Sequence, residues 1–373
     1  MPMLDRRLVR LLALLLGLTL IGAACGGSSS KSSAGSTTTA GGDTSTTAKG
    51  GDLSALSATL NGSGSSFQNN LELAEIDAFT TKASGVTINY NSVGSGQGKT
   101  DLANQVTDFA GSDSLVKDAD KATFKGGAFL YFPIAAGPIT VSYNVKGIDK
   151  LALSAPTLAG IMQGDIKTWS DPKIKADNPT GTLPATKITI VHRADGSGTT
   201  SGFTHYLDKA SGGVWKLGAG DTVNWPANSQ AGQKNTGVAQ AIQQTDGAVG
   251  YVDFSDAQAV KLKLASIKNK AGTFIDPTLA GASAALAGAT VNADLSVDAL
   301  DATGATAYPI TTPTYVIAYV NQTDKAKGAA LVAYLRYLLT DGQAAAGGSG
   351  YAKLSDDLAS KAVAQLDSIK LPA

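Results

Sequence analysis

One stretch near the middle of the chain constrains the fold most. An apolar, β-branched run (188–191) is followed by the glycine-punctuated turn Arg193-Ala194-Asp195-Gly196-Ser197-Gly198-Thr199-Thr200 and then by Phe203, Tyr206 and Leu207 at helical spacing. The pattern predicts a strand that ends in a turn and opens a helix. Such a turn aims backbone N–H groups and the positive end of a helix dipole at one point, an arrangement that binds oxyanions. Arg193 adds charged donors that Asp195 can hold in place, although the two could also form an ordinary surface ion pair.

Strands and helices alternate in the same way nearer the N-terminus. We expect short strands at 58–60, 86–90 and 108–111, each followed by a turn rich in small residues. Helices are expected through Leu71 and through Leu102 and Val106. The alternation predicts an α/β fold with a largely parallel sheet. Ligands of such sheets bind at the carboxyl ends of the strands, where these turns stand.

At 373 residues the chain exceeds one ordinary domain. Two strongly apolar, extended segments, 129–145 and 308–320, bracket a central block with an α/β pattern of its own. They predict two crossovers between two lobes, with lobe I formed by 53–135 plus 311–373 and lobe II by 136–310. A last helix is expected to pack back on lobe I, and its apolar face holds Leu331, Tyr334, Leu335 and Leu338.

The N-terminus carries the features of an export signal over residues 1–25. A basic start precedes an apolar segment that is shorter than the ~20 residues of a membrane span. The segment ends in Gly22-Ala23-Ala24-Cys25, which resembles a bacterial lipobox, so we expect Cys25, the only Cys of the chain, to carry a lipid. The alternative is an ordinary signal peptide that contains a Cys. Residues 26–52, almost entirely Gly, Ser, Thr and Ala, predict a flexible tether that holds the folded body at the outer face of the cell membrane.

Charge and cysteine counts argue against several classes of function. Lys and Arg balance Asp and Glu at 30 each, so the chain lacks the excess of basic residues that favours binding of nucleic acid. One Cys and two His cannot form a structural zinc site, and we expect neither a metal nor a cofactor. The turn 93–100 nearly matches the sequence motif of a nucleotide-binding loop, but Val93 stands where the motif requires its first Gly. Ser197 lacks the Gly two residues before it that a hydrolase nucleophile elbow needs.

Four segments in chain order resemble those of one known family. They are Gly62-Ser63-Gly64-Ser65-Ser66-Phe67, Gly94-Ser95-Gly96, Gly111-Ser112-Asp113 and Arg193-Ala194-Asp195-Gly196-Ser197-Gly198-Thr199. The chain resembles the phosphate-binding proteins of bacterial ABC phosphate importers, the PstS family, over roughly residues 56–360. The resemblance implies a two-lobed periplasmic-binding-protein (Venus flytrap) fold that clamps phosphate in the cleft between its lobes and performs no catalysis.

Carried over position by position, the resemblance implies a ligand set drawn from both lobes. The residues expected to bind phosphate are Ser66, Phe67, Ser95 and Asp113 in lobe I and Arg193, Ser197, Gly198 and Thr199 in lobe II, with Asp195 holding Arg193. Ser66 stands where a Thr is frequent, which keeps the hydroxyl, and His192 stands where a second basic residue is common. The implied partners are inorganic phosphate, a membrane ABC permease with its ATPase, and the membrane through the lipid anchor.

Asp113 is the residue expected to set selectivity. A carboxylate suits an anion site only when the ligand brings a proton, which hydrogen phosphate does and sulfate at neutral pH does not. With sulfate, two acceptors would face each other. The alternative role for Asp113 is to cap a helix together with its serine neighbours. Two other functions stay open on the same fold, a phosphate-ester hydrolase and a binding protein for another oxyanion such as sulfate, and so does an added role as adhesin or sensor.

Overall fold

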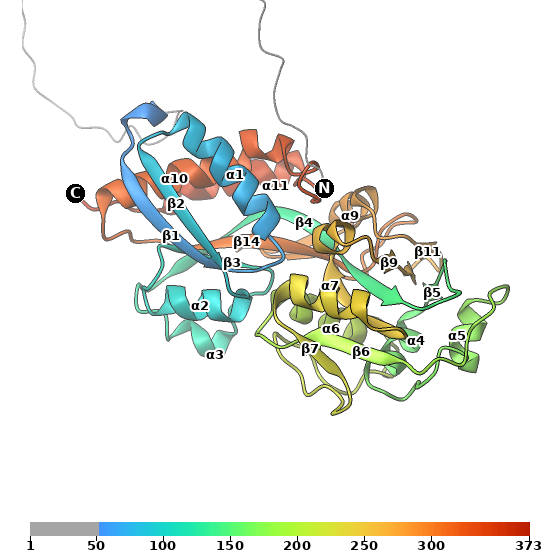
Figure 1. Ribbon diagram of the computed structural model, residues 1–373. Coiled ribbons are helices and arrows are strands. Elements are labelled where there is room, and N and C mark those ends of the chain that lie inside the picture. Colours follow the sequence, from blue (N-terminus) through green and yellow to red (C-terminus); the bar gives the residue numbers. More distant parts are fainter. Residues whose placement is uncertain (1–51) are drawn as a thin grey trace, which may run out of the picture. The chain divides into compact units, whose positions relative to one another are not determined.

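The two apolar segments form the long strands β4 (Phe129–Asn144) and β14 (Thr311–Tyr319). They pair antiparallel along the whole of β14, and nearly every residue in them is buried. Both lie in the middle of the main sheet in the computed structural model, which describes residues 52–373 (Figure 1). The predicted export signal, Cys25 and all but the last residue of the predicted tether lie outside the described residues.

The main sheet has nine strands in the part of the chain that the structure describes, in the order β2-β1-β3-β14-β4-β8-β6-β7, with β9 paired to β4. Strand β1 is parallel to β2 and β3, and β6 is parallel to β7 and β8. The predicted parallel arrangement therefore holds toward both edges of the sheet but is wrong for its middle, where β14 and β4 run antiparallel to their neighbours. The reason is that β4 carries the chain from one half of the sheet to the other and β14 carries it back. The remaining bounds are β1 Ala58–Gly64, β2 Val86–Ser92, β3 Phe109–Ser112, β6 Thr189–Arg193, β7 Gln230–Gly232, β8 Ala248–Asp253 and β9 Lys263–Leu264.

Two small sheets stand beside the main one. The first joins β5 (Ala152–Leu153), β10 (Ser266–Lys268) and β11 (Phe274–Ile275), and the second pairs β12 (Thr290–Val291) with β13 (Val297–Asp298).

Helices pack on both faces of the sheet. Helix α1 packs on β2 and α10 on β1, whereas α2 packs on β1 and β3. Leu60, Phe79 and Tyr334 share one core cluster and Leu102, Ala110 and Tyr315 share another, because the side chains of a strand alternate between its two faces. The helix bounds are α1 Asn69–Lys82, α2 Ser95–Ala103, α3 Asp118–Lys121, α4 Ala155–Met162, α5 Pro172–Asp177, α6 Gly198–Ala210, α7 Lys234–Gln244, α8 Phe254–Ala259, α9 Leu279–Ala287, α10 Lys325–Leu339 and α11 Asp356–Gln365, with short 3-10 turns at Leu53–Ala55, Asp341–Ala344 and Leu366–Ser368.

Two helix predictions have opposite outcomes. The last apolar helix is α10, and its four predicted core residues are buried against lobe I. The helix expected to run through Val106 is shorter than predicted, because α2 ends at Ala103 and Val106 is 68% exposed. Gln105 adopts a φ of 59°, a left-handed conformation that ends a helix.

The predicted lobe boundaries fall within β4 and at the start of β14. Strand β4 runs past 135/136 without a break and β14 begins at 311, so the division at 135/136 and 310/311 stays a prediction, and we keep the names lobe I and lobe II for it. Among residues 52–373, no helix combines the length and the apolar character needed to cross a membrane.

Candidate functional site

The ends of parallel strands bring the predicted site residues together. In lobe I, β1 runs into the turn that holds Ser66 and Phe67, and β3 ends next to Asp113. In lobe II, β6 ends at Arg193 and leads into α6. Turns at the carboxyl ends of parallel strands meet at one edge of a sheet. The site is therefore assembled from two such edges that face each other.

Asp113 is buried in the middle of this site. Its Oδ1 lies 2.5 Å from Ser65 Oγ and 2.9 Å from Thr314 Oγ1, while Oδ2 has only a long contact of 3.4 Å, with Ser95 Oγ. Burial raises the pKa of Asp113 to about 6, against the opposing effect of the hydroxyl hydrogen bonds and of nearby Arg193. The group is a carboxylate at neutral pH, and its Oδ2 keeps most of its capacity to accept a hydrogen bond.

Asp113 caps no helix. The next helix along the chain, α3, begins five residues later at Asp118, and its cap residue is Lys117. The predicted alternative role as a helix cap is therefore wrong, since the chain between Asp113 and α3 continues as loop.

Arg193 and Asp195 form a buried ion pair. Arg193 Nε donates to Asp195 Oδ1 at 2.9 Å and Nη2 contacts Oδ2, and only 1% of the Arg193 side chain is exposed. The alternative of a surface pair is thus wrong. The Lys234 backbone N–H also donates to Asp195 Oδ1, at 2.9 Å. With two of its donors held, the guanidinium has a fixed orientation in which Nη1 lies 3.5 Å from Thr199 Oγ1.

The start of α6 faces Asp113. Ser197 is the cap residue of this helix, and its Oγ accepts from the Thr200 N–H at 3.1 Å. Gly198 follows at the first helical position, where a β-carbon would lie 2.6 Å from Asp113 Oδ2. A side chain at this position would therefore collide with the carboxylate, and glycine lets the helix N-terminus approach it.

Some predicted donors are already used within the chain. The Phe67 N–H donates to Ser65 Oγ at 2.9 Å, and the Ser197 N–H donates to the Asp221 carbonyl oxygen at 3.0 Å. Ser66 is 6% exposed, and its Oγ accepts from the Asn235 N–H at 3.2 Å. Of the predicted set, the hydroxyls of Ser66, Ser197 and Thr199 and the N-terminus of α6 therefore have the most freedom to meet an anion.

Sequence reasoning missed three residues of the site. Ser65 and Thr314 bind Asp113, and Asn235 contacts both Ser66 and Thr199. The signal that could have found Asn235 is the polar run Gln233-Lys234-Asn235-Thr236, which follows β7 and opens α7 as the turn after β6 opens α6. Ser65 could not be told from Ser66 by pattern, and Thr314 stands in an apolar run that gave no sign of a polar role.

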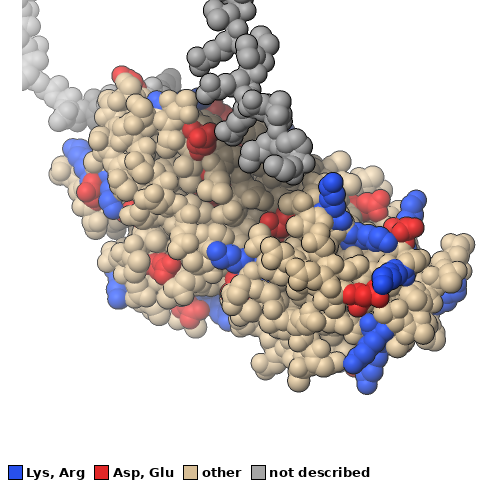
Figure 2. Space-filling view, in the orientation of Figure 1, with Lys and Arg blue, Asp and Glu red and all other residues tan. Residues whose placement is uncertain are grey.

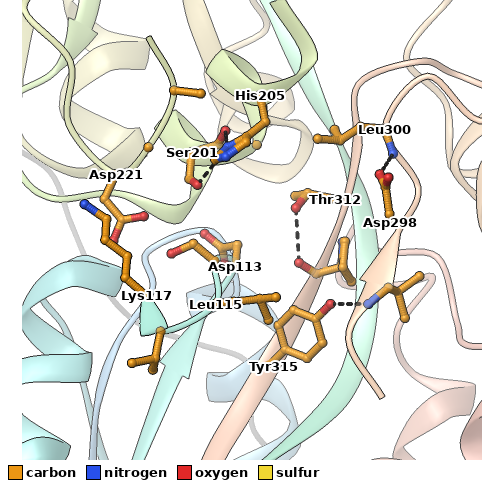
Figure 3. A pocket seen from close by; sticks show the side chains of 17 residues that line it. Asp113, Leu115, Lys117, Ser201, His205, Asp221, Asp298, Leu300, Thr312 and Tyr315 are labelled. Carbon is orange, nitrogen blue, oxygen red and sulfur yellow. Dashed lines mark hydrogen bonds between the residues drawn. The ribbon is translucent and has the colours of Figure 1, made fainter. Parts of the chain in front are cut away.

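A cavity of about 350 Å³ adjoins the site between the lobes. Figure 3 shows Asp113 at its wall, with Ser201 and His205 of α6 on one side and Thr312 and Tyr315 of β14 on another. On the face of the molecule in Figure 2, basic and acidic side chains are interspersed, so on this face attraction of an anion would depend on local donors.

The lobes also touch directly around the site. The Gly96 N–H donates to the Gly196 carbonyl oxygen at 3.0 Å, and Lys99 forms an ion pair with Asp221 at 2.8 Å. Lys99 belongs to the near-match to a nucleotide-binding loop. In this fold its ammonium group binds a carboxylate of the opposite lobe.

The side chains that a hydrolase would need are differently engaged. His192 stacks on Trp225 with ring centroids 5.1 Å apart, and burial lowers its pKa. His205 Nδ1 lies 2.8 Å from the Ser201 carbonyl oxygen. Within residues 52–373 neither histidine hydrogen-bonds Ser197, and no group of three or more His, Cys, Asp or Glu could hold a metal ion.

Comparison with known proteins places the chain in a family. Residues 32–341 match the model of the PBP superfamily domain. The phosphate-binding protein PstS 3 of Mycobacterium tuberculosis is 36% identical over 315 residues, which cover 81% of this chain and 84% of that protein. The chain belongs to the PstS family of phosphate-binding proteins. PstS of Xylella fastidiosa is 35% identical over 308 residues, covering 81% of this chain and 83% of that PstS.

Solved structures agree with the fold expected for PstS. A high-affinity periplasmic phosphate-binding protein (PfluDING), bound with phosphate, has a TM-score of 0.68 at 21% identity, covering 83% of this chain and 94% of that one. The phosphate-binding protein from Stenotrophomonas maltophilia also has a TM-score of 0.68, at 20% identity, covering 82% and 93%. The predicted two-lobed periplasmic-binding-protein fold and the membership of the PstS family are confirmed.

Proposed function

We propose that this PstS-family protein captures inorganic phosphate between its lobes and delivers it to a membrane ABC permease and its ATPase. The observation that carries the proposal is the position of Asp113, whose Oδ2 faces the N-terminus of α6 beside the buried pair of Arg193 and Asp195. Positive donors around one carboxylate suit an anion that carries its own proton. The names of the relatives, all phosphate-binding proteins, support the same ligand.

The ligand set that we propose is the one expected from the sequence. It comprises Ser66, Phe67, Ser95, Asp113, Arg193, Ser197, Gly198 and Thr199, with Asp195 orienting Arg193. The N–H of Phe67 would join it only by leaving Ser65 Oγ, so its share is smaller than that of the hydroxyls. A dehydrated oxyanion needs nearly all its hydrogen bonds replaced, because each buried unpaired polar group costs about 1–3 kcal/mol.

Titration calorimetry on the purified protein tests this function. We expect tight binding of phosphate and negligible binding of sulfate at about pH 8. Equal affinity for the two anions would remove the role given to Asp113. Turnover of a chromogenic phosphate ester would instead favour the hydrolase, which no contact in the described residues supports.

The proposal includes export and a lipid anchor at Cys25. It rests on the basic start, the apolar segment and the two small residues before the only Cys. The lipid would keep the binding protein at the outer face of the membrane, close to its permease. Metabolic labelling with a fatty acid tests the anchor. Label that is still incorporated into a Cys25→Ser variant would contradict a lipid at Cys25.

A further inference from the structure

Asn235 is fully buried in the first turn of α7. It begins a buried stripe of this helix whose other members, Val238, Ala239 and Ile242, are apolar. A polar side chain at such a position is unfavourable unless its hydrogen bonds are made. The contacts of Asn235 therefore explain its presence there.

Each polar atom of the Asn235 side chain has a partner. Nδ2 lies 3.1 Å from Thr199 Oγ1 and 3.3 Å from Ser66 Oγ, and Oδ1 accepts from the Asp253 N–H at 3.3 Å. A backbone N–H can only donate, so the contact with Asp253 fixes which end of the amide is the oxygen. The two hydrogens of Nδ2 consequently point at two hydroxyl oxygens, one in each lobe.

These contacts decide what the two hydroxyls can do. A hydroxyl oxygen accepts up to two hydrogen bonds and donates one. Ser66 Oγ accepts from both the backbone N–H and the side chain of Asn235, and Thr199 Oγ1 accepts from Asn235 and, at 3.5 Å, from Arg193. With these acceptor sites taken, each hydroxyl has only its proton to offer, and no group among residues 52–373 accepts it. An anion is the partner that fits.

The first residue of α7, Lys234, helps to hold Asn235 in this position. Lys234 adopts a φ of 60°, a left-handed conformation that is unfavourable for a lysine. In this conformation its N–H donates to Asp195 Oδ1, and the next N–H along the chain, that of Asn235, donates to Ser66 Oγ. Backbone strain of this kind persists only where the surroundings enforce it.

We infer that Asn235 is a positioning residue of the anion site, which turns the hydroxyl protons of Ser66 and Thr199 toward the ligand. The inference rests on the proposed function and deepens it. It assigns to Asn235 the selection of a ligand with acceptor oxygens on both sides of the cleft. Asn235 acts through the two hydroxyls and needs no contact with the anion.

The test is a cycle of variants whose phosphate affinity is measured by calorimetry on the purified full chain. Asn235→Ala should weaken phosphate binding about 10–100-fold, because two hydroxyls lose the contacts that orient them toward a charged ligand. In a chain that already carries Ser66→Ala and Thr199→Val, the same change should weaken binding less than about threefold. Equal losses in the two backgrounds would mean that Asn235 only packs, and would overturn the inference. So would an unchanged affinity of the single variant.

A second variant covers the case in which Asn235→Ala or the combined variants fold poorly. Asn235→Asp keeps the shape and the acceptor for the Asp253 N–H, but places an acceptor where Nδ2 stood. Ser66 and Thr199 would then donate to the new carboxylate, so binding should fall further than in Asn235→Ala, by about 100-fold or more. If Asn235 only packed, Asn235→Asp should lose less phosphate affinity than Asn235→Ala, because Asp fills the space that Ala would leave empty.

Asn70→Asp is the matched control for added charge. Asn70 also bridges the lobes, through Nδ2 to Ser255 Oγ at 2.8 Å, but contacts neither Ser66 nor Thr199. The phosphate affinity of the Asn70→Asp variant should stay within about threefold of that of the parent protein. A loss equal to that of Asn235→Asp would assign the effect to charge alone and overturn the inference. A parent protein that binds no phosphate would reject the proposed function, whereas tight binding by the parent with unaffected Asn235 variants would reject this inference alone.

Discussion

At the scale of the residue, Asp113 is the group that distinguishes this site from a general oxyanion site. Its pKa is raised by burial to about 6, so above that pH it is a carboxylate and below it a neutral acid. A carboxylate accepts the proton of hydrogen phosphate but faces sulfate as a second acceptor. The neutral acid can donate to sulfate.

This titration gives sulfate binding a pH dependence of known sign. We expect sulfate affinity to rise about tenfold as the pH falls from about 8 to about 5, because the repulsion of two acceptors becomes a hydrogen bond. Phosphate brings its own proton at both values and should change less. Calorimetry with each anion at the two values measures the effect. Asp113→Asn should bring the affinities for phosphate and sulfate closer together and remove the pH dependence of sulfate binding. A variant that keeps the parent protein's ratio of the two affinities would contradict the role of Asp113.

Two residues of the site show what the sequence could and could not predict at this scale. The Arg193 and Asp195 pair follows from a local turn, because residues two apart in a tight turn can bind each other whatever surrounds them. Asn235 reaches Ser66 across 169 residues of sequence, and its role depends on where β7 joins the sheet. No local pattern in the sequence carries that placement, so a polar residue in the first turn of α7 gave no sign that its side chain enters the site.

At the scale of the element, α1 carries a buried pair of carboxylates that the site does not use. Glu72 is hydrogen-bonded by Gln68 at 2.7 Å and by the Tyr334 hydroxyl at 2.6 Å. Glu75 is 1% exposed, and neither of its carboxylate oxygens has a partner among residues 52–373. Burial raises the pKa of both groups to about 7, and the nearby Glu72 contributes to the shift at Glu75.

The buried carboxylates predict a loss of stability toward high pH. Because their pKa is higher in the folded than in the unfolded chain, the folded state holds protons that the unfolded state releases between about pH 4.5 and about pH 7. The free energy of unfolding should therefore fall over that range and stay low above it. Glu75→Gln should raise the free energy of unfolding by about 1–3 kcal/mol at about pH 8, and the gain should shrink toward pH 5.

Urea unfolding followed by circular dichroism at the two pH values measures this gain. Asp77→Asn is the matched control on the exposed side of the same helix, and we expect it to change the free energy of unfolding by less than about 0.5 kcal/mol. A gain of equal size in both variants, or one that is independent of pH, would contradict the assignment to Glu75.

The elements themselves were predictable where a segment is uniformly apolar or strongly periodic. The core face of α10 and the extended character of β4 and β14 follow from such patterns. The antiparallel pairing of β4 with β14 does not, because register and direction depend on how the chain returns between the lobes. The end of α2 was missed because Gln105 adopts a left-handed conformation that its residue type does not signal.

At the scale of the whole molecule, we expect the proposed capture of phosphate between the lobes to require the lobes to close, and we expect the contacts between them to set how long they stay closed. Lys99 makes a charged contact between the lobes: its Nζ lies 2.8 Å from Asp221 Oδ2 in lobe II and 2.8 Å from Ser114 Oγ in lobe I. The two charged side chains are only 14% and 19% exposed, so water screens their attraction less than at the surface. Asp221 also accepts the Ser197 N–H through its carbonyl oxygen, which links this contact to the start of α6.

We therefore expect Lys99→Met to speed the release of phosphate about 5–30-fold while changing the rate of capture little. The methionine keeps the aliphatic stem, and the lost ion pair forms only when the lobes meet, so the effect should fall on dissociation. Stopped-flow fluorescence with a phosphate chase measures both rates. Lys82→Met is the matched control, because Lys82 pairs with Asp341 inside lobe I and both side chains are about half exposed or more, at 48% and 63%. Similar release rates in the two variants would show that the Lys99–Asp221 contact does not hold the lobes closed, and closure would then depend on the ligand and the uncharged contacts around it.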